Sequence, residues 1–177
     1  MSERIYSLVR EIKDFPKPGV LFRDITPILL DPAAMVEVVN TLAQPLRPLG
    51  ITKVVAVESR GFILGAPVAM ALGVGLVIVR KPGKLPADVH RVEYDLEYGT
   101  DAIEVHQDAL HGGDVAVVLD DVLATGGTAA AAAALVERAG SRVAAFSFLI
   151  ELADLGGRAR LGGRAVYAVL RYPRSEA

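Results

Sequence analysis

The segment VAVVLDDVLATGGTA, Val115 to Ala129, combines side chains and backbone freedom that could hold a phosphorylated ligand. The residues in it that could bind a ligand are two acids, two glycines and two threonines: Asp120, Asp121, Thr125, Gly126, Gly127 and Thr128. The glycines let the backbone approach an anion closely, and amides at the start of the following helix would point toward it. The threonine hydroxyls add further donors. We therefore predict a phosphate-binding loop after a buried strand.

Paired carboxylates beside a phosphate site suit a ligand that also carries hydroxyl groups. Carboxylates accept hydrogen bonds, so Asp120 and Asp121 could hold the diol of a ribose while backbone amides hold its phosphate. A sugar phosphate therefore satisfies both halves of the motif. The plainer alternative is an acidic turn that ends a strand, caps a helix and binds nothing.

The chain lacks two common nucleotide-binding motifs. No lysine follows the glycines of the loop in the G-x-x-x-x-G-K-[ST] order of a P-loop. The G-x-G of Gly73 to Gly75 has no third glycine and runs into Leu76 to Ile78, where a strand is expected instead of a helix. We therefore expect neither a P-loop enzyme nor a dinucleotide-binding enzyme.

Cationic residues follow two further predicted strands. The turn Glu58-Ser59-Arg60-Gly61 comes directly after one of them, and its guanidinium could grip pyrophosphate oxygens in a bidentate manner. Arg80, Lys81 and Lys84 follow the next strand and could neutralise charge on a departing pyrophosphate. The alternative for each of them is an exposed charge on a solvated face.

These segments need a framework that brings strand ends together. Short apolar runs alternate with helical stretches, which predicts an α/β fold with a mainly parallel central sheet and flanking helices. In such a sheet, ligands bind beyond the carboxyl ends of the strands. The expected strands are Lys53 to Val57, Leu76 to Val79, Val115 to Leu119, Val143 to Leu149 and Ala165 to Leu170. The expected helices are Ala33 to Leu46, with Asp31 as N-cap and Pro32 as its first residue, Gly61 to Leu72 and Gly126 to Ala139.

Composition and charge exclude several classes of protein. The 177 residues are 52% hydrophobic, and 19 basic against 21 acidic residues give a net charge of -2, so we expect no nucleic-acid partner. The absence of cysteine excludes disulfides and thiol chemistry and is typical of the cytoplasm, where we expect the protein to reside. The charged N-terminal segment does not resemble a secretory signal. The uncharged stretch Gly61 to Val79 is broken by Pro67 and by Gly73, which predicts a buried helix and strand and no membrane partner.

Four segments resemble one enzyme family. DDVLATGGT resembles the phosphoribosyl pyrophosphate motif of the type I phosphoribosyltransferases. The other segments resemble the adenine phosphoribosyltransferase branch, in order and in spacing: FPKPGVLFRDITP (Phe15 to Pro27), ESRGF (Glu58 to Phe62) and VRKPGKLP (Val79 to Pro86) with LEYGTD (Leu96 to Asp101). The resemblance spans about Phe15 to Leu170. It implies one domain over residues 1–177, with a small N-terminal base-binding hood at about 1–30 and a flexible β-hairpin lid at about 84–98.

The resemblance also implies a reaction. The enzyme would transfer the 5-phosphoribosyl group of phosphoribosyl pyrophosphate to adenine, giving AMP and pyrophosphate, as part of purine salvage. Mg²⁺ would be the cofactor, carried mainly by the pyrophosphate donor, so no residues are assigned as metal ligands. A homodimer is implied as the assembly.

By the same resemblance, each segment receives a role. Ala124 to Thr128 would hold the 5′-phosphate and the two aspartates the ribose hydroxyls. Further contacts to the donor would come from Ser59, Arg60, Lys81 and Lys84. Phe22 would stack on adenine. Backbone groups of Leu21 and Arg23 would read the edge of the base, and a carbonyl that accepts from the exocyclic amino group disfavours a 6-oxo purine.

The long polar stretch Lys84 to Tyr98, followed by a possible strand at Thr100 to His106, is typical of a lid or a binding loop. Closing a lid would keep water from an oxocarbenium-like state. At its return end, the resemblance makes Glu97 and Tyr98 catalytic candidates together with Arg60. Glu97 could manage the purine ring proton or stabilise the cationic sugar, and Tyr98 could position the leaving group or phosphate. For Glu97 the alternative is a surface carboxylate beside a hairpin.

Two other functions stay open at this point. The same donor could serve hypoxanthine, guanine, xanthine or orotate, although the VLFRDI segment resembles the adenine branch. Alternatively, the sugar-phosphate site could serve as a sensor in a regulator that binds nucleic acid. Such a regulator should show a basic face, which a net charge of -2 does not favour.

Overall fold

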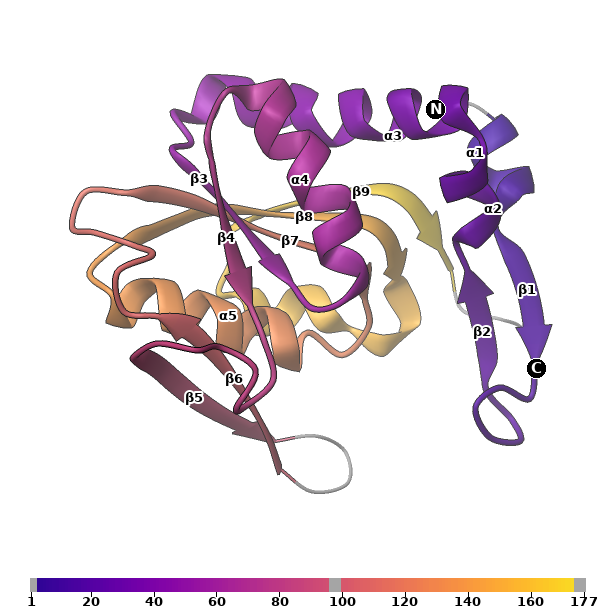
Figure 1. Ribbon diagram of the computed structural model, residues 1–177. Helices are drawn as coiled ribbons and strands as arrows, with labels where there is room; N and C mark the ends of the chain where they lie inside the picture. The colour runs from indigo at the N-terminus through magenta and orange to yellow at the C-terminus, as the bar shows by residue number, and fades with distance from the viewer. Residues whose placement is uncertain (1–2, 96–99, 174–177) are drawn as a thin grey trace.

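A computed structural model describes residues 3–95 and 100–173 of the chain. Its centre is a five-stranded sheet in the order β4-β3-β7-β8-β9, in which every neighbouring pair is parallel (Figure 1). The strands are β3 (Lys53–Val57), β4 (Gly75–Val79), β7 (Val115–Leu123), β8 (Arg142–Leu152) and β9 (Ala165–Tyr172). All five predicted strands are present, and the predicted α/β class with a parallel central sheet is confirmed.

Strand β7 extends beyond its predicted end. The sequence predicts that the strand stops at Leu119, whereas β7 continues to Leu123 and contains both Asp120 and Asp121. The pairing of β7 with β3 ends at Leu119, but its pairing with β8 continues as far as Leu123 opposite Glu151. The two acids therefore lie in a strand that is paired on one side, not in the loop that follows.

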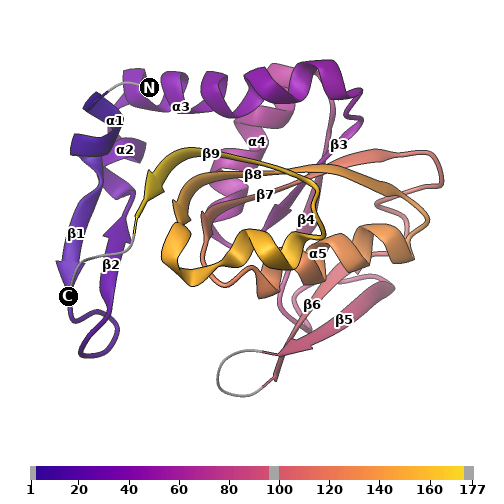
Figure 2. The ribbon, with the colours of Figure 1, turned by 180° about the vertical axis from the view of Figure 1, so that it is seen from behind.

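Helices cover both faces of the sheet. Figures 1 and 2 show α3 (Pro32–Ala43) and α4 (Arg60–Leu72) on one face and α5 (Gly127–Arg138) on the other. A separate cluster of buried apolar side chains fills each interface. The side chain of Asp31 accepts hydrogen bonds from the amides of Ala33 and Ala34, which confirms the predicted start of α3. Beyond Ala43 the chain tightens into the 3₁₀ helix η1 (Gln44–Leu49).

Two antiparallel hairpins lie outside the central sheet. The first pairs β1 (Arg10–Lys13) with β2 (Leu21–Asp24), and the second pairs β5 (Val89–Asp95) with β6 (Thr100–His106). The predicted strand at 100–106 is confirmed. Pro16, Pro18 and Gly19 predict a turn-rich, irregular approach that presents the segment around Phe22 over the central sheet and not within it. The segment does lie outside the central sheet, but it is not irregular, because Phe22 lies in β2 opposite Ile12.

Short helices complete the fold: α1 (Glu3–Leu8), α2 (Thr26–Leu30) and the 3₁₀ helices η2 (Ala153–Leu155) and η3 (Gly157–Leu161). The uncharged stretch from Gly61 is divided at Gly73 as predicted, since α4 ends at Leu72 and Gly73 adopts the left-handed conformation before β4 begins. Pro67 lies inside α4 and does not end the helix. In the described part of the chain, no helix has the length and apolar character needed to cross a bilayer.

Candidate active site

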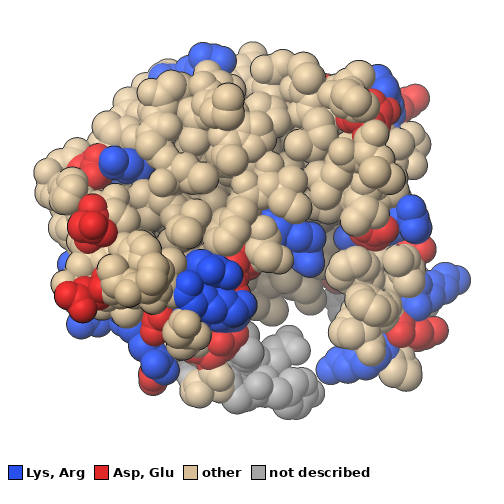
Figure 3. All heavy atoms as spheres, viewed as in Figure 1, with Lys and Arg blue, Asp and Glu red and all other residues tan. Residues whose placement is uncertain are grey.

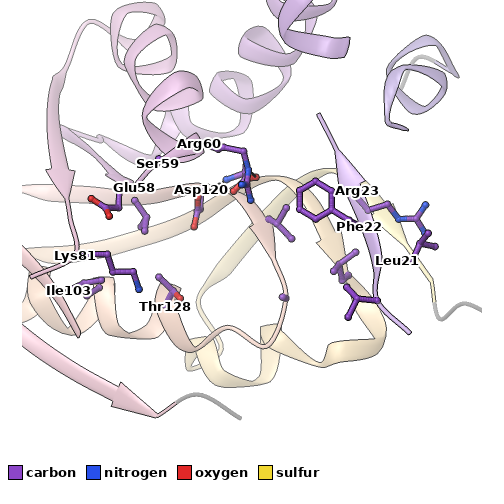
Figure 4. Close-up of a pocket in the computed structure, with 16 residues that line it drawn as sticks. Leu21, Phe22, Arg23, Glu58, Ser59, Arg60, Lys81, Ile103, Asp120 and Thr128 are labelled. Atoms are coloured by element: carbon purple, nitrogen blue, oxygen red, sulfur yellow. Dashed lines mark hydrogen bonds and ion pairs between the residues drawn. The ribbon is translucent and has the colours of Figure 1, made fainter. Parts of the chain in front are cut away.

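A cavity of about 460 Å³ opens at the carboxyl ends of β3 and β7, between the two hairpins (Figure 4). Figure 3 shows the hollow with blue side chains at its rim. Most residues predicted for the site line this cavity: Leu21, Phe22, Arg23, Ser59, Arg60, Lys81, Asp120, Asp121, Ala124 and Thr128. A smaller cavity of about 80 Å³ shares several of these residues and adds Thr125, Gly126 and Gly127. Four segments far apart in the sequence therefore meet at one edge of the sheet.

The loop of residues 124–128, here called the phosphate loop, is shaped by backbone contacts. Gly126 caps α5 with a φ of 82°, a left-handed conformation that favours glycine. A Cβ atom at this position would lie 2.5 Å from the carbonyl oxygen of Gly157, so the conformation and the space both require glycine. The first amides of α5 have no carbonyl partner within the helix. The loop therefore presents free N–H groups to an anion.

Gly157, which follows much later in the sequence, packs against the phosphate loop and supports it. A Cβ atom built on it would overlap the carbonyl oxygen of Ala124 and approach the amide nitrogen of Gly126 to 3.1 Å. The neighbouring Arg158 holds η3 in place, because its guanidinium donates two hydrogen bonds of 2.7 Å to the buried carboxylate of Glu151. Sequence reasoning missed this support, since nothing in the pattern of residues 151–158 indicates contact with a loop thirty positions earlier.

The two carboxylates have different surroundings. Asp121 is 5% exposed and forms an ion pair with Arg60 at the start of α4. Asp120 accepts a hydrogen bond of 2.8 Å from the amide of Asp121, while burial and then the neighbouring Asp121 carboxylate raise its pKa well above the ordinary value. Gly61 allows this arrangement, because a Cβ atom there would lie 2.9 Å from the Asp120 carboxylate.

The cations of the site are paired with carboxylates of the protein. Lys81 reaches into the cavity and pairs with Asp101 on β6. Lys84 and Arg80 instead donate to Glu58, at 2.6 Å and 3.0 Å, so the ammonium of Lys84 contacts Glu58 and does not line the main cavity. Glu58 was not predicted as a functional residue; only its position next to Ser59 could have indicated it.

Glu58 is a buried anchor for these cations. Its side chain is 8% exposed. Burial alone would raise the pKa of Glu58, but the hydrogen bonds from Lys84 and Arg80 outweigh this effect and hold the pKa below its ordinary value. The carboxylate therefore remains ionised and fixes two cations beside the cavity.

The β1–β2 hairpin supplies an aromatic wall of the cavity. Phe22 contributes its ring to the cavity, and the guanidinium carbon of Arg60 lies 5.8 Å from the ring centroid. The side chain of Arg23 points away, as Figure 4 shows, and stacks 4.0 Å from the ring centroid of Tyr172. Only the backbone of Arg23 therefore faces the cavity. Leu152 also lines this wall, although the sequence did not indicate it.

Two predicted catalytic residues, Glu97 and Tyr98, lie outside the described residues, so their placement stays a prediction. Within residues 3–95 and 100–173, no group of three or more histidine, cysteine or acidic side chains could hold a metal ion.

Comparison with known proteins identifies the family. A family model described as the phosphoribosyl transferase domain matches residues 28–158. The adenine phosphoribosyltransferase of Synechococcus sp. is 55% identical over 166 residues, which is 94% of this chain and 97% of that protein. The chain belongs to the adenine phosphoribosyltransferase family. It is thus an enzyme of purine salvage, as the resemblance in its motifs implied.

Solved adenine phosphoribosyltransferases share the fold. The structure from Thermoanaerobacter pseudethanolicus matches with a TM-score of 0.94 and 48% identity, covering 96% of this chain and 99% of that chain. The structure from Saccharomyces cerevisiae, solved with adenine and an imino-altritol bisphosphate, matches with a TM-score of 0.90 and 36% identity, covering 95% and 97%. The predictions of an adenine phosphoribosyltransferase and of its fold are confirmed.

Proposed function

We propose that the chain catalyses the transfer of a 5-phosphoribosyl group from phosphoribosyl pyrophosphate to adenine, with release of AMP and pyrophosphate. The observation that carries this proposal is the position of Asp120, which borders both the main cavity and the small cavity of the phosphate loop. A ligand with a phosphate in one cavity and hydroxyl groups beside the acids matches this arrangement.

In this proposal the phosphate loop binds the 5′-phosphate through its amides and the hydroxyls of Thr125 and Thr128. Asp120 and Asp121 accept hydrogen bonds from the ribose hydroxyls. Ser59, Arg60 and Lys81 then face the pyrophosphate, and the two cations stabilise the negative charge that develops as the bond from C1 of the ribose to pyrophosphate breaks. Lys84 acts from the edge of the cavity.

The opposite wall receives adenine. The ring of Phe22 stacks on the base, while backbone groups of Leu21 and Arg23 read its edge. A backbone carbonyl that accepts from the exocyclic amino group would face the oxygen of a 6-oxo purine without a proton between them, so adenine is preferred.

Mg²⁺ suits the oxygen donors of this cavity as a companion of the substrate. The ion commonly keeps several waters and binds one or two carboxylates together with substrate phosphates. Asp120 and Asp121 provide such carboxylates, and the two of them are too few for a resident ion. When bound, Mg²⁺ would neutralise part of the charge on the pyrophosphate.

Two further parts of the chain complete the proposal. Residues 1–30 act as the hood that presents the base-binding wall, and residues 84–98 act as a lid that excludes water from the cationic sugar. Glu97 manages the proton of the purine ring or stabilises the cationic sugar, and Tyr98 positions the leaving group or phosphate.

We further propose a homodimer formed through the outer face of α4. Ile63 and Met70, seven residues apart on one side of this helix, are 45% and 82% exposed, and Leu76 on the adjacent β4 is 40% exposed. Figure 3 shows a broad uncharged surface over α3 and α4. An exposed apolar patch is typical of an interaction surface, and in a two-fold dimer it would pack against its own copy. Met70→Lys should convert the dimer into a monomer in size-exclusion chromatography with light scattering.

The activity is tested by incubating the protein with phosphoribosyl pyrophosphate, Mg²⁺ and one base at a time. We expect nucleotide formation with adenine and none with hypoxanthine, guanine, xanthine or orotate. Product from another base would replace the proposed acceptor, and no product with any base would contradict the proposed transfer.

A further inference from the structure

A polar network links the β5–β6 hairpin to the phosphate loop through Tyr94, a residue to which the proposed reaction gives no role. The Tyr94 hydroxyl accepts hydrogen bonds from Lys81 Nζ at 3.1 Å and from Thr128 Oγ1 at 3.3 Å. It donates to Asp101 Oδ2 at 3.2 Å, and Lys81 pairs with the same carboxylate. One donated and two accepted bonds use the full capacity of a phenol hydroxyl.

The backbone holds Tyr94 at this junction. Tyr94 and Asp101 are direct partners across the two strands of the hairpin, and α5 packs against both strands. The ring of Tyr94 also lies 5.6 Å from the Lys81 ammonium, within the range of a cation–π contact. The tyrosine therefore contacts the first turn of α5 on one side and a cation of the cavity on the other.

The ammonium of Lys81 is held as a charged group by these partners. Partial burial would lower the pKa of Lys81, but the hydrogen bonds to Asp101 and Tyr94 outweigh it and raise the pKa above the ordinary value. In turn, the hydrogen bond from Lys81 lowers the pKa of Asp101. Both members of the pair therefore stay ionised near neutral pH, and Lys81 arrives at the cavity in a fixed position.

Thr128 cannot serve two acceptors at once. Its hydroxyl carries a single proton, which it donates to Tyr94 in this structure. A phosphate in the phosphate loop would compete for the same proton and would be the stronger acceptor, because it is charged. Binding of the phosphate therefore has to break the bond between Thr128 and Tyr94.

We propose that Tyr94 is a positioning residue for the transfer reaction: its hydroxyl holds Lys81 beside the cavity and competes with the 5′-phosphate for the proton of Thr128. This inference rests on the proposed function, since it assigns the phosphate to the loop and the pyrophosphate to Lys81. The hydroxyl thus has two opposed effects. It weakens binding of a sugar phosphate, and it supports turnover by placing the cation.

The variant Tyr94→Phe tests both effects, because it removes the hydroxyl and keeps the ring. We expect ribose 5-phosphate, measured by isothermal titration calorimetry, to bind about two- to tenfold more tightly, the range of one neutral hydrogen bond. We expect kcat with phosphoribosyl pyrophosphate and adenine to fall by about the same factor, because Lys81 loses one of its partners. Damage to the fold would instead weaken binding and turnover together.

A double-mutant cycle with Thr128 tests whether the change in ribose 5-phosphate affinity comes from the hydrogen bond between Tyr94 and Thr128. In a Thr128→Ala background, Tyr94→Phe should leave the affinity for ribose 5-phosphate unchanged, whereas in a Thr128→Ser background, which keeps a hydroxyl, the tightening should return. Tyr6→Phe is the matched control, since it removes a tyrosine hydroxyl that bonds to the backbone of Arg171, outside the cavity.

The results separate this inference from the proposed function. Unchanged or weaker ribose 5-phosphate binding in Tyr94→Phe, or tightening that persists without the Thr128 hydroxyl, would overturn the role of Tyr94 even if the protein makes AMP. If the unaltered protein makes no AMP but shows the expected cycle, the proposed reaction fails and the competition for Thr128 stands. No binding of ribose 5-phosphate to the unaltered protein would overturn both.

Discussion

The two sides of the cavity are built in different ways. The phosphate loop, residues 124–128, is shaped by backbone packing against Gly157 and offers N–H groups that need no partner exchange. On the opposite side, Arg60, Lys81 and Lys84 are each paired with a carboxylate of the protein. The backbone amides of the first side are therefore ready for an anion, and Thr128 is the side chain there that exchanges a partner, whereas the cations of the other side must share or leave a carboxylate when pyrophosphate binds.

This difference separates the two tasks of the site. A preformed loop loses little conformational entropy when it binds, so it suits the part of the substrate that is held throughout the reaction. Self-paired cations suit a leaving group, because the protein carboxylates regain the cations when pyrophosphate departs. The ion pairs also keep the cavity from carrying a large uncompensated charge when it is empty.

The largest expected effect comes from neutralising the acids where the two sides meet. Asp120→Asn with Asp121→Asn should lower kcat/KM for phosphoribosyl pyrophosphate at least about a hundredfold, since each hydrogen bond to a charged group contributes about 1.5 to 3 kcal/mol. Adenine binding, measured separately by calorimetry, should change much less. Asp108→Asn, at an exposed acid in the turn after β6, is the control for an aspartate-to-asparagine change outside the cavity. Equal losses for both ligands, with the fold intact by circular dichroism, would contradict the assignment of the acids to the ribose.

A second variant tests whether the phosphate loop is preformed by its packing. Gly157→Ala places a methyl group against Ala124 and Gly126, so the loop has to move. We expect a loss of about 1 to 3 kcal/mol in the free energy of unfolding and a fall of about a hundredfold in kcat/KM, as for a displacement of about 1 Å at a reacting group. Gly112→Ala, where a Cβ atom meets nothing within 4 Å, should behave like the unaltered protein. Full activity of Gly157→Ala would show that the loop does not depend on this contact.

The ion-paired side is tested through Glu58. Its pKa is lower in the folded protein, so its contribution to stability is present above the pKa of an unfolded carboxyl, about 4.3, and is lost as the pH falls through the folded value. Glu58→Gln should lower the free energy of unfolding by about 2 kcal/mol at pH 7, because two charged hydrogen bonds are weakened. Denaturant titrations should show the gap between the two proteins closing between about pH 5 and pH 3. A gap that stays constant over that range would rule out the ionised carboxylate as its source.

The sequence predicts the first side of the cavity better than the second. The glycines and hydroxyls of the phosphate loop are neighbours in the chain, so their shared role is visible in one segment, and the alternation of apolar runs predicts the sheet that positions them. The pairs of the second side join residues far apart in sequence, such as Glu58 with Lys84 and Lys81 with Asp101. No local pattern reveals which acid meets which base, and for the same reason the support from Gly157 was not predicted.

The strands of the N-terminal hairpin were not predicted, and its role as a base-binding hood stays a prediction. Pro16, Pro18 and Gly19 correctly indicate a turn, but the turn joins β1 to β2 and places Phe22 in a strand. These strands are four residues long and are not buried within a layer of the fold, so they lack the apolar run that marks the central strands. Tertiary contacts, such as Arg23 on Tyr172 at the end of β9, hold the hairpin instead.

The smallest expected effect concerns the aromatic wall formed by the β1–β2 hairpin, which carries neither the phosphate loop nor the ion-paired cations. Phe22→Leu keeps an apolar side chain in β2 and removes the aromatic face, so the KM for adenine should rise about two- to tenfold, the range of a stacking contact. The KM for phosphoribosyl pyrophosphate should stay the same, because the phosphate loop and the ion pairs are untouched. Phe15→Leu is the matched control: its ring packs edge-on against Phe22, with centroids 5.1 Å apart, and does not line the cavity. If both variants raise the adenine KM equally, the effect comes from the packing of the hairpin, and Phe22 is not the surface on which the base stacks.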